Sequence, residues 1–169
     1  MYWFDWMTLG IVVVVTLVET LRSMKAGGMG QAIFDGAGLV VAAVAATTFA
    51  KPLSLLVGIE KWIVMLVIFG VLGIGAFILG RYLFNLTQWS FQSMDGVFSA
   101  IGGLVGAWAI GHMVLRIIIE KQGGMTGAVG ALLQNAVVAR EVYFFNGWNW
   151  LVHLLFRARL GPDFNPDVG

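Results

Sequence analysis

The sequence predicts an all-α protein, a polytopic membrane helix bundle with about four transmembrane helices. Three observations predict this fold class. Of the 169 residues, 59% are hydrophobic and only 11% are charged, whereas a soluble domain usually carries about 25% charged residues. Four segments approach the roughly 20 apolar residues that cross a bilayer core about 30 Å thick. These segments also lack the polar residues that a soluble helix places on its outward-facing side.

The predicted transmembrane domain comprises residues 1–120, and its spans cover residues 3–21, 32–50, 62–86 and 96–119. Aromatic side chains at the start of the first span suit the headgroup layer. The second span is predicted to stop at Lys51 and Pro52, because proline disfavours helical geometry in the residue before it. The third span is the clearest, since residues 63–80 include no charge. The glycines between the first two spans predict a loop at Gly27, Gly28 and Gly30.

Residues 121–169 are predicted to form a separate C-terminal region. Its first apolar run is too short to span, because polar residues interrupt it at Gln134, Asn135, Arg140 and Glu141. Residues 143–160 interleave aromatic with polar side chains, which favours an amphipathic helix lying in the membrane interface over one that crosses the membrane. The last residues, 161–169, contain two prolines and two aspartates and are predicted to form an extended tail.

Small residues recur every four positions in the fourth predicted span, at Ser99, Gly103, Ala107 and Gly111, with Gly102 and Gly106 on a neighbouring line. Residues four apart share one face of a helix. In lipid, small side chains on such a face let a second helix approach closely. We therefore expect this row to pack against another helix, either in the same chain or in a second copy.

Ionisable residues inside or beside the apolar spans are the second informative pattern. Such residues cost free energy at membrane depth unless they are paired or hydrated. We interpret Arg81, Asp95, Arg116 and Glu120 as boundary markers, because they lie near the ends of the segments. Glu19 and Asp35 lie further inside and flank one short loop. They form either an intramembrane site for a proton or ion, or a local pair with Arg22 or Lys25.

Several classes of function are disfavoured. The formal net charge is +1 and no basic run occurs, so nucleic acid is not an expected partner. Cysteine is absent, which excludes thiolate nucleophiles and metal sites built on sulfur. His112 and His153 have no metal-ligand spacing, and no G-x-S-x-G motif occurs. We therefore expect no enzyme activity, no cofactor and no metal.

Charges, glycines and a proline follow one another in a distinctive order along residues 5–120. An aspartate precedes the first span, a glycine-containing basic loop follows it, a proline closes the second span, the third span ends in Gly-Arg, and an aspartate opens the glycine-spaced fourth span. The residues are Asp5, Arg22, Lys25, Gly27, Gly28, Gly30, Pro52, Phe69, Gly80, Arg81, Asp95, Ser99, Gly103, Ala107 and Gly111. In this order the sequence resembles the bacterial CvpA-like (colicin V production) family of membrane proteins.

This resemblance implies a multi-pass protein of the bacterial inner membrane without an assigned catalytic activity. It implies a role in toxin (colicin) secretion or envelope homeostasis, which a scaffold would perform through lipid, a second copy of the chain or other membrane proteins. The alternative is a small channel or transporter that uses Glu19 and Asp35. Orientation stays open, because the basic first loop of the family favours an external N-terminus, whereas the count of lysine and arginine favours an internal one.

Overall fold

The structure, a computed structural model, describes residues 2–26, 28–87 and 94–144. Within these ranges the chain is helical and contains no strand, so the predicted all-α fold is confirmed. Four helices are long, and all four are long and apolar enough to cross a membrane. They are α1 (Trp3–Ala26), α2 (Gly28–Val57), α3 (Lys61–Thr87) and α4 (Asp95–Lys121).

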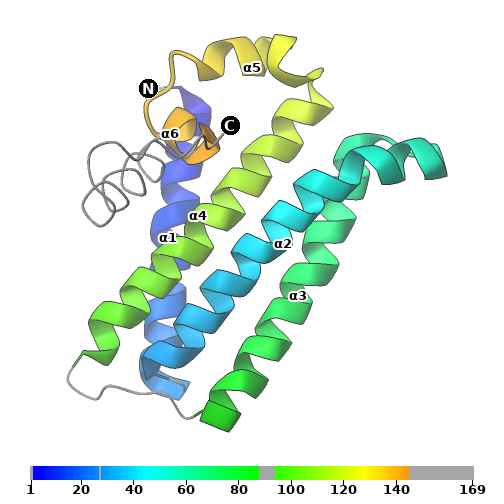
Figure 1. Cartoon of the computed structure of the whole chain (residues 1–169). Coiled ribbons are helices and arrows are strands. Elements are labelled where there is room, and N and C mark those ends of the chain that lie inside the picture. Colours follow the sequence, from blue (N-terminus) through cyan, green and yellow to red (C-terminus); the bar gives the residue numbers. More distant parts are fainter. Residues whose placement is uncertain (1, 27, 88–93, 145–169) are drawn as a thin grey trace, which may run out of the picture.

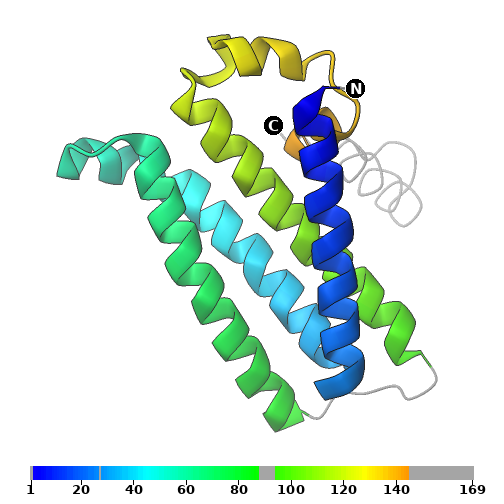
Figure 2. The ribbon, with the colours of Figure 1, turned by 180° about the vertical axis from the view of Figure 1, so that it is seen from behind.

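The two central helices are α2 and α4, which run in the same direction through the bundle (Figure 1). Helix α1 packs against α4, and α3 packs against α2, each antiparallel to its neighbour. The view from behind shows the same order, with α1 and α3 on opposite flanks (Figure 2). The four helices therefore form an open row rather than a closed square.

Three short helices follow α4 and cross one end of the bundle (Figure 1). They are the 3-10 helix η1 (Gly124–Thr126), α5 (Ala128–Leu133) and α6 (Val138–Phe144). Their apolar side chains, including Leu133, Ala139 and Val142, join Phe4 and Leu115 in a buried cluster. This packing places α6 beside the beginning of α1. The interfacial segment predicted for residues 143–160 lies outside the described residues, except for its first two positions.

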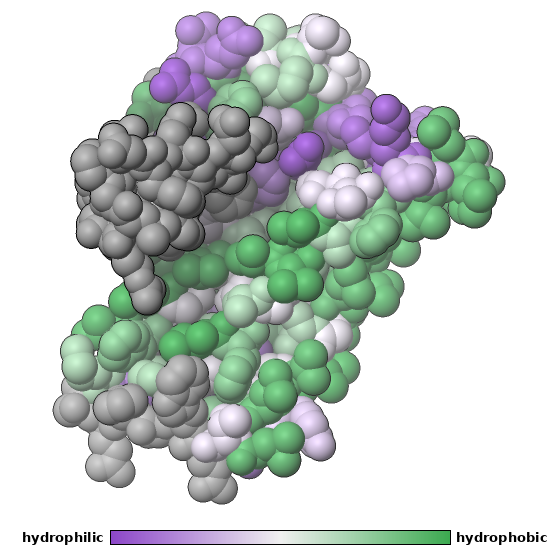
Figure 3. All heavy atoms as spheres, viewed as in Figure 1, coloured by the Kyte–Doolittle hydropathy of each residue, from purple (hydrophilic) through white to green (hydrophobic). Residues whose placement is uncertain are grey.

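Apolar side chains cover the outside of the long helices, including Leu66, Val71, Ile74 and Ile78 on α3. Hydrophobic residues dominate the middle and lower parts of the face in Figure 3, and hydrophilic residues gather toward the upper end. Between α2, α3 and α4, alanines contribute to a tight core, at Ala43, Ala46, Ala50 and Ala109. An apolar exterior combined with a tightly packed interior suits lipid as the solvent.

The prediction that the second span stops at Pro52 is wrong. Helix α2 continues through Pro52 to Val57, and its last turns bend away from the rest of the helix (Figures 1 and 2). Proline removes one intrahelical hydrogen bond and displaces the preceding turn, which bends a helix without necessarily ending it. The helix ends instead before Gly58, whose φ of 71° is one that side-chain-bearing residues rarely adopt.

The prediction of a loop at Gly28 and Gly30 is also wrong, because both residues belong to the first turn of α2. Gly28 has a φ of 61°, which lets the chain reverse direction almost immediately after α1. The carboxylate of Asp95, from the start of α4, accepts a hydrogen bond from the Met29 backbone N–H at 3.3 Å. A remote side chain therefore caps this helix, and the local sequence gives no sign of it.

Candidate functional site

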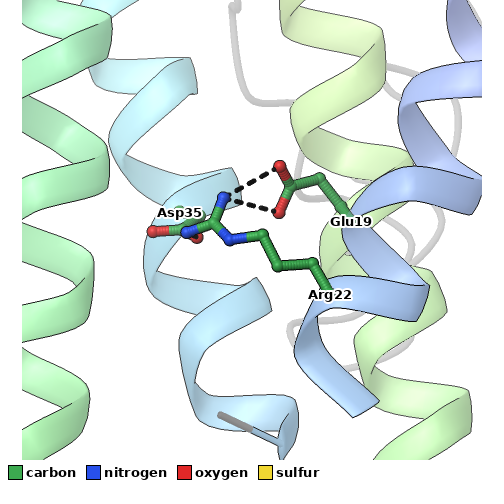
Figure 4. Close-up of polar contacts among 3 residues, drawn as sticks. All are labelled: Glu19, Arg22 and Asp35. Atoms are coloured by element: carbon green, nitrogen blue, oxygen red, sulfur yellow. Dashed lines mark hydrogen bonds and ion pairs between the residues drawn. The ribbon is translucent and has the colours of Figure 1, made fainter. Parts of the chain in front are cut away.

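The candidate site is a cluster of three charged side chains, Glu19, Arg22 and Asp35, near one end of the bundle (Figure 4). Arg22 Nη1 lies 3.1 Å and 3.3 Å from the two carboxylate oxygens of Glu19. Arg22 Nη2 lies 3.1 Å from Asp35 Oδ2. The guanidinium group thus sits between two carboxylates that come from different helices.

Helix geometry explains why these residues meet. Glu19 and Arg22 are three positions apart on α1, so they share one face of that helix. Asp35 comes from α2, two turns after the sharp connection at Gly28. The planar guanidinium presents donors in several directions, which allows one arginine to engage two carboxylates. The sequence predicted a local pair with either Arg22 or Lys25. The structure shows the pair with Arg22, whereas Lys25 is exposed.

The cluster is largely excluded from the molecular surface. Asp35 is only 2% exposed and Glu19 only 8% exposed, whereas the Arg22 side chain keeps 36% of its surface accessible. Arginine can hold its charged head near water or headgroups while its stem lies along apolar surface. The two carboxylates are therefore buried, and the arginine side chain extends from them to the surface of the bundle.

A glycine of α3 makes room for Asp35. A Cβ atom at Gly80 would overlap the Asp35 carboxylate, with Oδ1 as the nearest atom. One turn earlier on the same helix, the ring of Phe77 lies against the Arg22 guanidinium, 5.2 Å from ring centroid to Cζ. This distance is within the range of a cation–π interaction. Helix α3 thus supplies space for one carboxylate and an aromatic wall for the cation.

A glycine of α4 makes room for Glu19. A Cβ at Gly103 would lie 3.2 Å from Glu19 Cβ and 3.2 Å from the Thr16 carbonyl oxygen. Such distances are tighter than most Cβ contacts in proteins. All four long helices therefore contribute to the cluster: α1 and α2 carry the charges, and α3 and α4 carry the two glycines.

The depth of the cluster follows from the helix bounds. Glu19 lies seven residues before the end of α1, and Asp35 lies seven residues after the start of α2. At 1.5 Å per residue, this is about 10 Å from that end of the bundle. Helix α1, with 24 residues, is about 36 Å long, so a hydrocarbon core of about 30 Å centred on it includes the cluster.

The row of small residues in α4 lies on the side that faces α1. Gly103 is next to Thr16 and Glu19, and Gly111 is next to Thr8 and Val12. Ser99 and Ala107, the other members of the row, are both completely buried. The partner helix of this row belongs to the same chain.

The neighbouring line of glycines faces α2 instead. A Cβ at Gly102 would lie 2.6 Å from the carbonyl carbon of Ala32, and one at Gly106 would lie 3.1 Å from Leu39 Cδ1. Gly36 of α2 approaches equally closely from the other side, because its Cβ would lie 2.6 Å from the Gly102 carbonyl oxygen. Helix α4 therefore uses two adjacent small faces to contact both neighbours.

The residues interpreted as boundary markers lie at both ends of the bundle. Lys61 Nζ and Glu120 Oε1 form an ion pair of 2.8 Å at the end opposite the cluster. Arg116 lies over the ring of Tyr143 in α6, at 5.9 Å. Arg81 is exposed at the cluster end, where Asp95 caps α2. None of these four residues belongs to the Glu19–Arg22–Asp35 cluster.

The structure also shows a second buried polar group that the sequence did not single out as a site. Asp5 is fully buried, and its Oδ1 accepts hydrogen bonds from the backbone N–H groups of Val138 and Ala139, at 3.1 Å and 3.0 Å. It therefore caps α6 from a position more than 130 residues earlier in the chain. At the other end of α6, His112 Nδ1 lies 3.2 Å from the Val142 carbonyl oxygen. Both contacts join residues that are far apart in the sequence, so only the tertiary structure reveals them.

Among the residues that the structure describes, no group of three or more histidine, cysteine or acidic side chains could hold a metal ion. The expected absence of a cofactor stays a prediction. Comparisons with protein-family models, with curated proteins and with solved structures give no match for this chain.

Proposed function

We propose that this chain is a non-enzymatic, CvpA-like protein of the bacterial inner membrane that crosses the membrane four times and acts as a scaffold or factor in toxin secretion or envelope homeostasis. The observation that carries the proposal is the internal pairing of the Glu19–Arg22–Asp35 cluster. In a channel or transporter, intramembrane carboxylates line a continuous pathway that crosses the bundle from one side of the membrane to the other. Here Arg22 engages both carboxylates, and two glycines close the helices around them.

The packing of the long helices supports a structural role. Glycine and alanine bring α4 into close contact with both α1 and α2, which is how membrane helices gain stability where hydrophobic burial contributes little. An open surface groove of about 320 Å³ between α2 and α3 is lined by apolar side chains alone, among them Phe49, Leu53 and Val71. Such a lining suits a lipid chain and offers nothing to an ion.

The second candidate is a small channel or transporter that uses Glu19 and Asp35. One observation favours it: two carboxylates and one guanidinium leave a formal charge of −1 in the cluster. A site with one missing positive charge could bind a transported cation or proton. The transport candidate predicts a flux of protons or cations through the protein, whereas the scaffold proposal predicts no such flux.

Reconstitution in liposomes separates the two candidates. The scaffold proposal predicts proton and potassium fluxes equal to those of protein-free liposomes. It also predicts a membrane protein that co-purifies with the chain after gentle extraction from bacterial membranes. Flux above background that is lost in Asp35→Asn and retained in Glu60→Gln, an exposed carboxylate outside the cluster, would contradict the scaffold proposal and establish transport.

A further inference from the structure

The charge of the Glu19–Arg22–Asp35 cluster is unbalanced inside a region that disfavours net charge. The neighbouring groups do not neutralise this net charge. From α3, the contacts are Phe77 and Gly80, and from α4 the contact is Gly103. None of these carries a charge, and both Lys25 and Arg81 are exposed. A net charge at this depth is unfavourable, so one further positive charge is expected in the cluster.

A metal ion does not fit this requirement. Arg22 occupies the position between the two carboxylates, where a bridging cation would have to bind. The described residues also contain no group of three or more potential ligands. Calcium and magnesium need several oxygen ligands, whereas a proton needs only one. The proton is therefore the occupant that the geometry allows.

The two carboxylates differ in how well the arginine satisfies them. Both oxygens of Glu19 accept hydrogen bonds from Arg22 Nη1. Arg22 approaches Asp35 only at Oδ2, and neither of the buried Asp35 oxygens accepts a well-aligned hydrogen bond. Oδ1 lies next to Gly80 of α3. Gln31, one turn earlier on α2, is buried as well.

We propose that Asp35 carries an exchangeable proton on Oδ1, which makes the cluster a proton-binding site within the membrane-spanning bundle. The proton comes from water at the cluster end of the bundle, where Arg22 remains partly accessible. Binding forms one O–H bond on Asp35 and neutralises the cluster. Its release leaves two carboxylates that compete for one guanidinium. The strength of the contact between α1 and α2 then depends on the pH at that end of the protein.

Infrared spectroscopy of the purified full-length protein tests this proposal directly. A protonated carboxylic acid gives a C=O stretch that is separate from the carboxylate bands. We expect this band in the wild type at mildly acidic pH, and we expect it to decrease as the pH is raised. Selective ¹³C labelling of aspartate carboxyls should shift the band, and labelling of glutamate should leave it in place.

Substitutions provide the matched controls. Asp35→Asn keeps the shape of the protonated side chain, so the protein should remain folded while the band is lost. Glu19→Gln leaves one carboxylate for one guanidinium, so Asp35 should ionise and the band should again be lost. Glu60→Gln should retain it. Absence of the band in the folded wild type, its persistence in Asp35→Asn, or a shift on glutamate labelling would each overturn the proposal.

Discussion

Glycine residues set how closely the helices approach the two buried carboxylates. Gly80 and Gly103 belong to different helices, but each occupies the position where a methyl group would meet Asp35 or Glu19. Glycine is otherwise unfavourable in a helix interior, by roughly 1 kcal/mol relative to alanine. Its presence at these two positions has a steric cause that can be tested by substitution.

The first prediction concerns Gly103. Replacement by leucine inserts a branched side chain against Glu19 and the Thr16 carbonyl, so α1 and α4 must separate. We expect Gly103→Leu to lower the free energy of unfolding in detergent by about 1 to 3 kcal/mol, as overpacking usually does. Gly70→Leu is the matched control, because nothing lies within 4 Å of a Cβ there, and Leu104→Ile should also cost little. Equal melting behaviour of Gly103→Leu and Gly70→Leu would show that this face has no helix against it.

The second prediction concerns Arg22. Its replacement by methionine leaves Glu19 and Asp35 without their cation, and a buried pair broken in this way usually costs roughly 3 to 5 kcal/mol. The triple variant Glu19→Gln, Arg22→Met, Asp35→Asn removes all three charges and should regain most of the lost stability. Thermal unfolding in detergent measures the stability of the single and the triple variant. If the single variant is as stable as the wild type, the ion pairs contribute nothing to the fold.

At the scale of elements, α6 is held at the end of the bundle by one side chain of α1. Asp5 satisfies two N–H groups at the start of α6, and a helix of seven residues is too short to be stable alone. The packing of Val142 and Ala139 against the long helices completes the attachment. The short helices therefore depend on contacts distant in sequence.

The third prediction follows from this cap. Asp5→Ala removes the acceptor and should destabilise the docking of α6 by about 1 kcal/mol, the usual cost of a lost helix cap. Hydrogen exchange at Val138 and Ala139 should then become faster, while exchange in the middle of α2 should not change. Asp5→Asn retains an oxygen acceptor and should have a smaller effect. Unchanged exchange in Asp5→Ala would contradict the role of this carboxylate.

The long helices were predictable at this scale because each leaves a continuous apolar signal longer than about 17 residues. Their ends were less predictable. Pro52 looked like a terminus, but packing of Ala50 and Met65 on either side of the α2–α3 connection supports a bent helix through it. Gly28 looked like part of a loop, but Asp95 stabilises a helix start there from 66 residues away. A pattern within one segment cannot report a partner from another.

At the scale of the whole molecule, the candidate site was only partly predictable. Glu19 and Asp35 stood out because charges inside apolar segments are rare, and this property can be read from each segment alone. Their joint contact with Arg22, and the role of Gly80 and Gly103 around it, depend on how four helices are arranged. The order of helices in the row, with α4 between α1 and α2, cannot be read from hydropathy.

In the proposed topology, four helices cross the membrane and place the Glu19–Arg22–Asp35 cluster near one side of it. This topology puts the beginning of α1 and the end of α4 at the same end of the bundle (Figure 1). It also separates the exposed connections into two groups. Lys25 and Thr87 lie at the cluster end, and Ile59 and Gln122 lie at the opposite end.

The most direct test is cysteine accessibility, because the chain has no cysteine of its own. Single cysteines at Lys25, Thr87, Ile59 and Gln122 would be labelled with a membrane-impermeant maleimide in right-side-out and inverted membrane vesicles. We predict that Lys25→Cys and Thr87→Cys react in one type of vesicle, and that Ile59→Cys and Gln122→Cys react in the other. Labelling of Lys25→Cys and Ile59→Cys from the same side, or of Thr87→Cys and Gln122→Cys from the same side, would contradict the four-helix membrane topology.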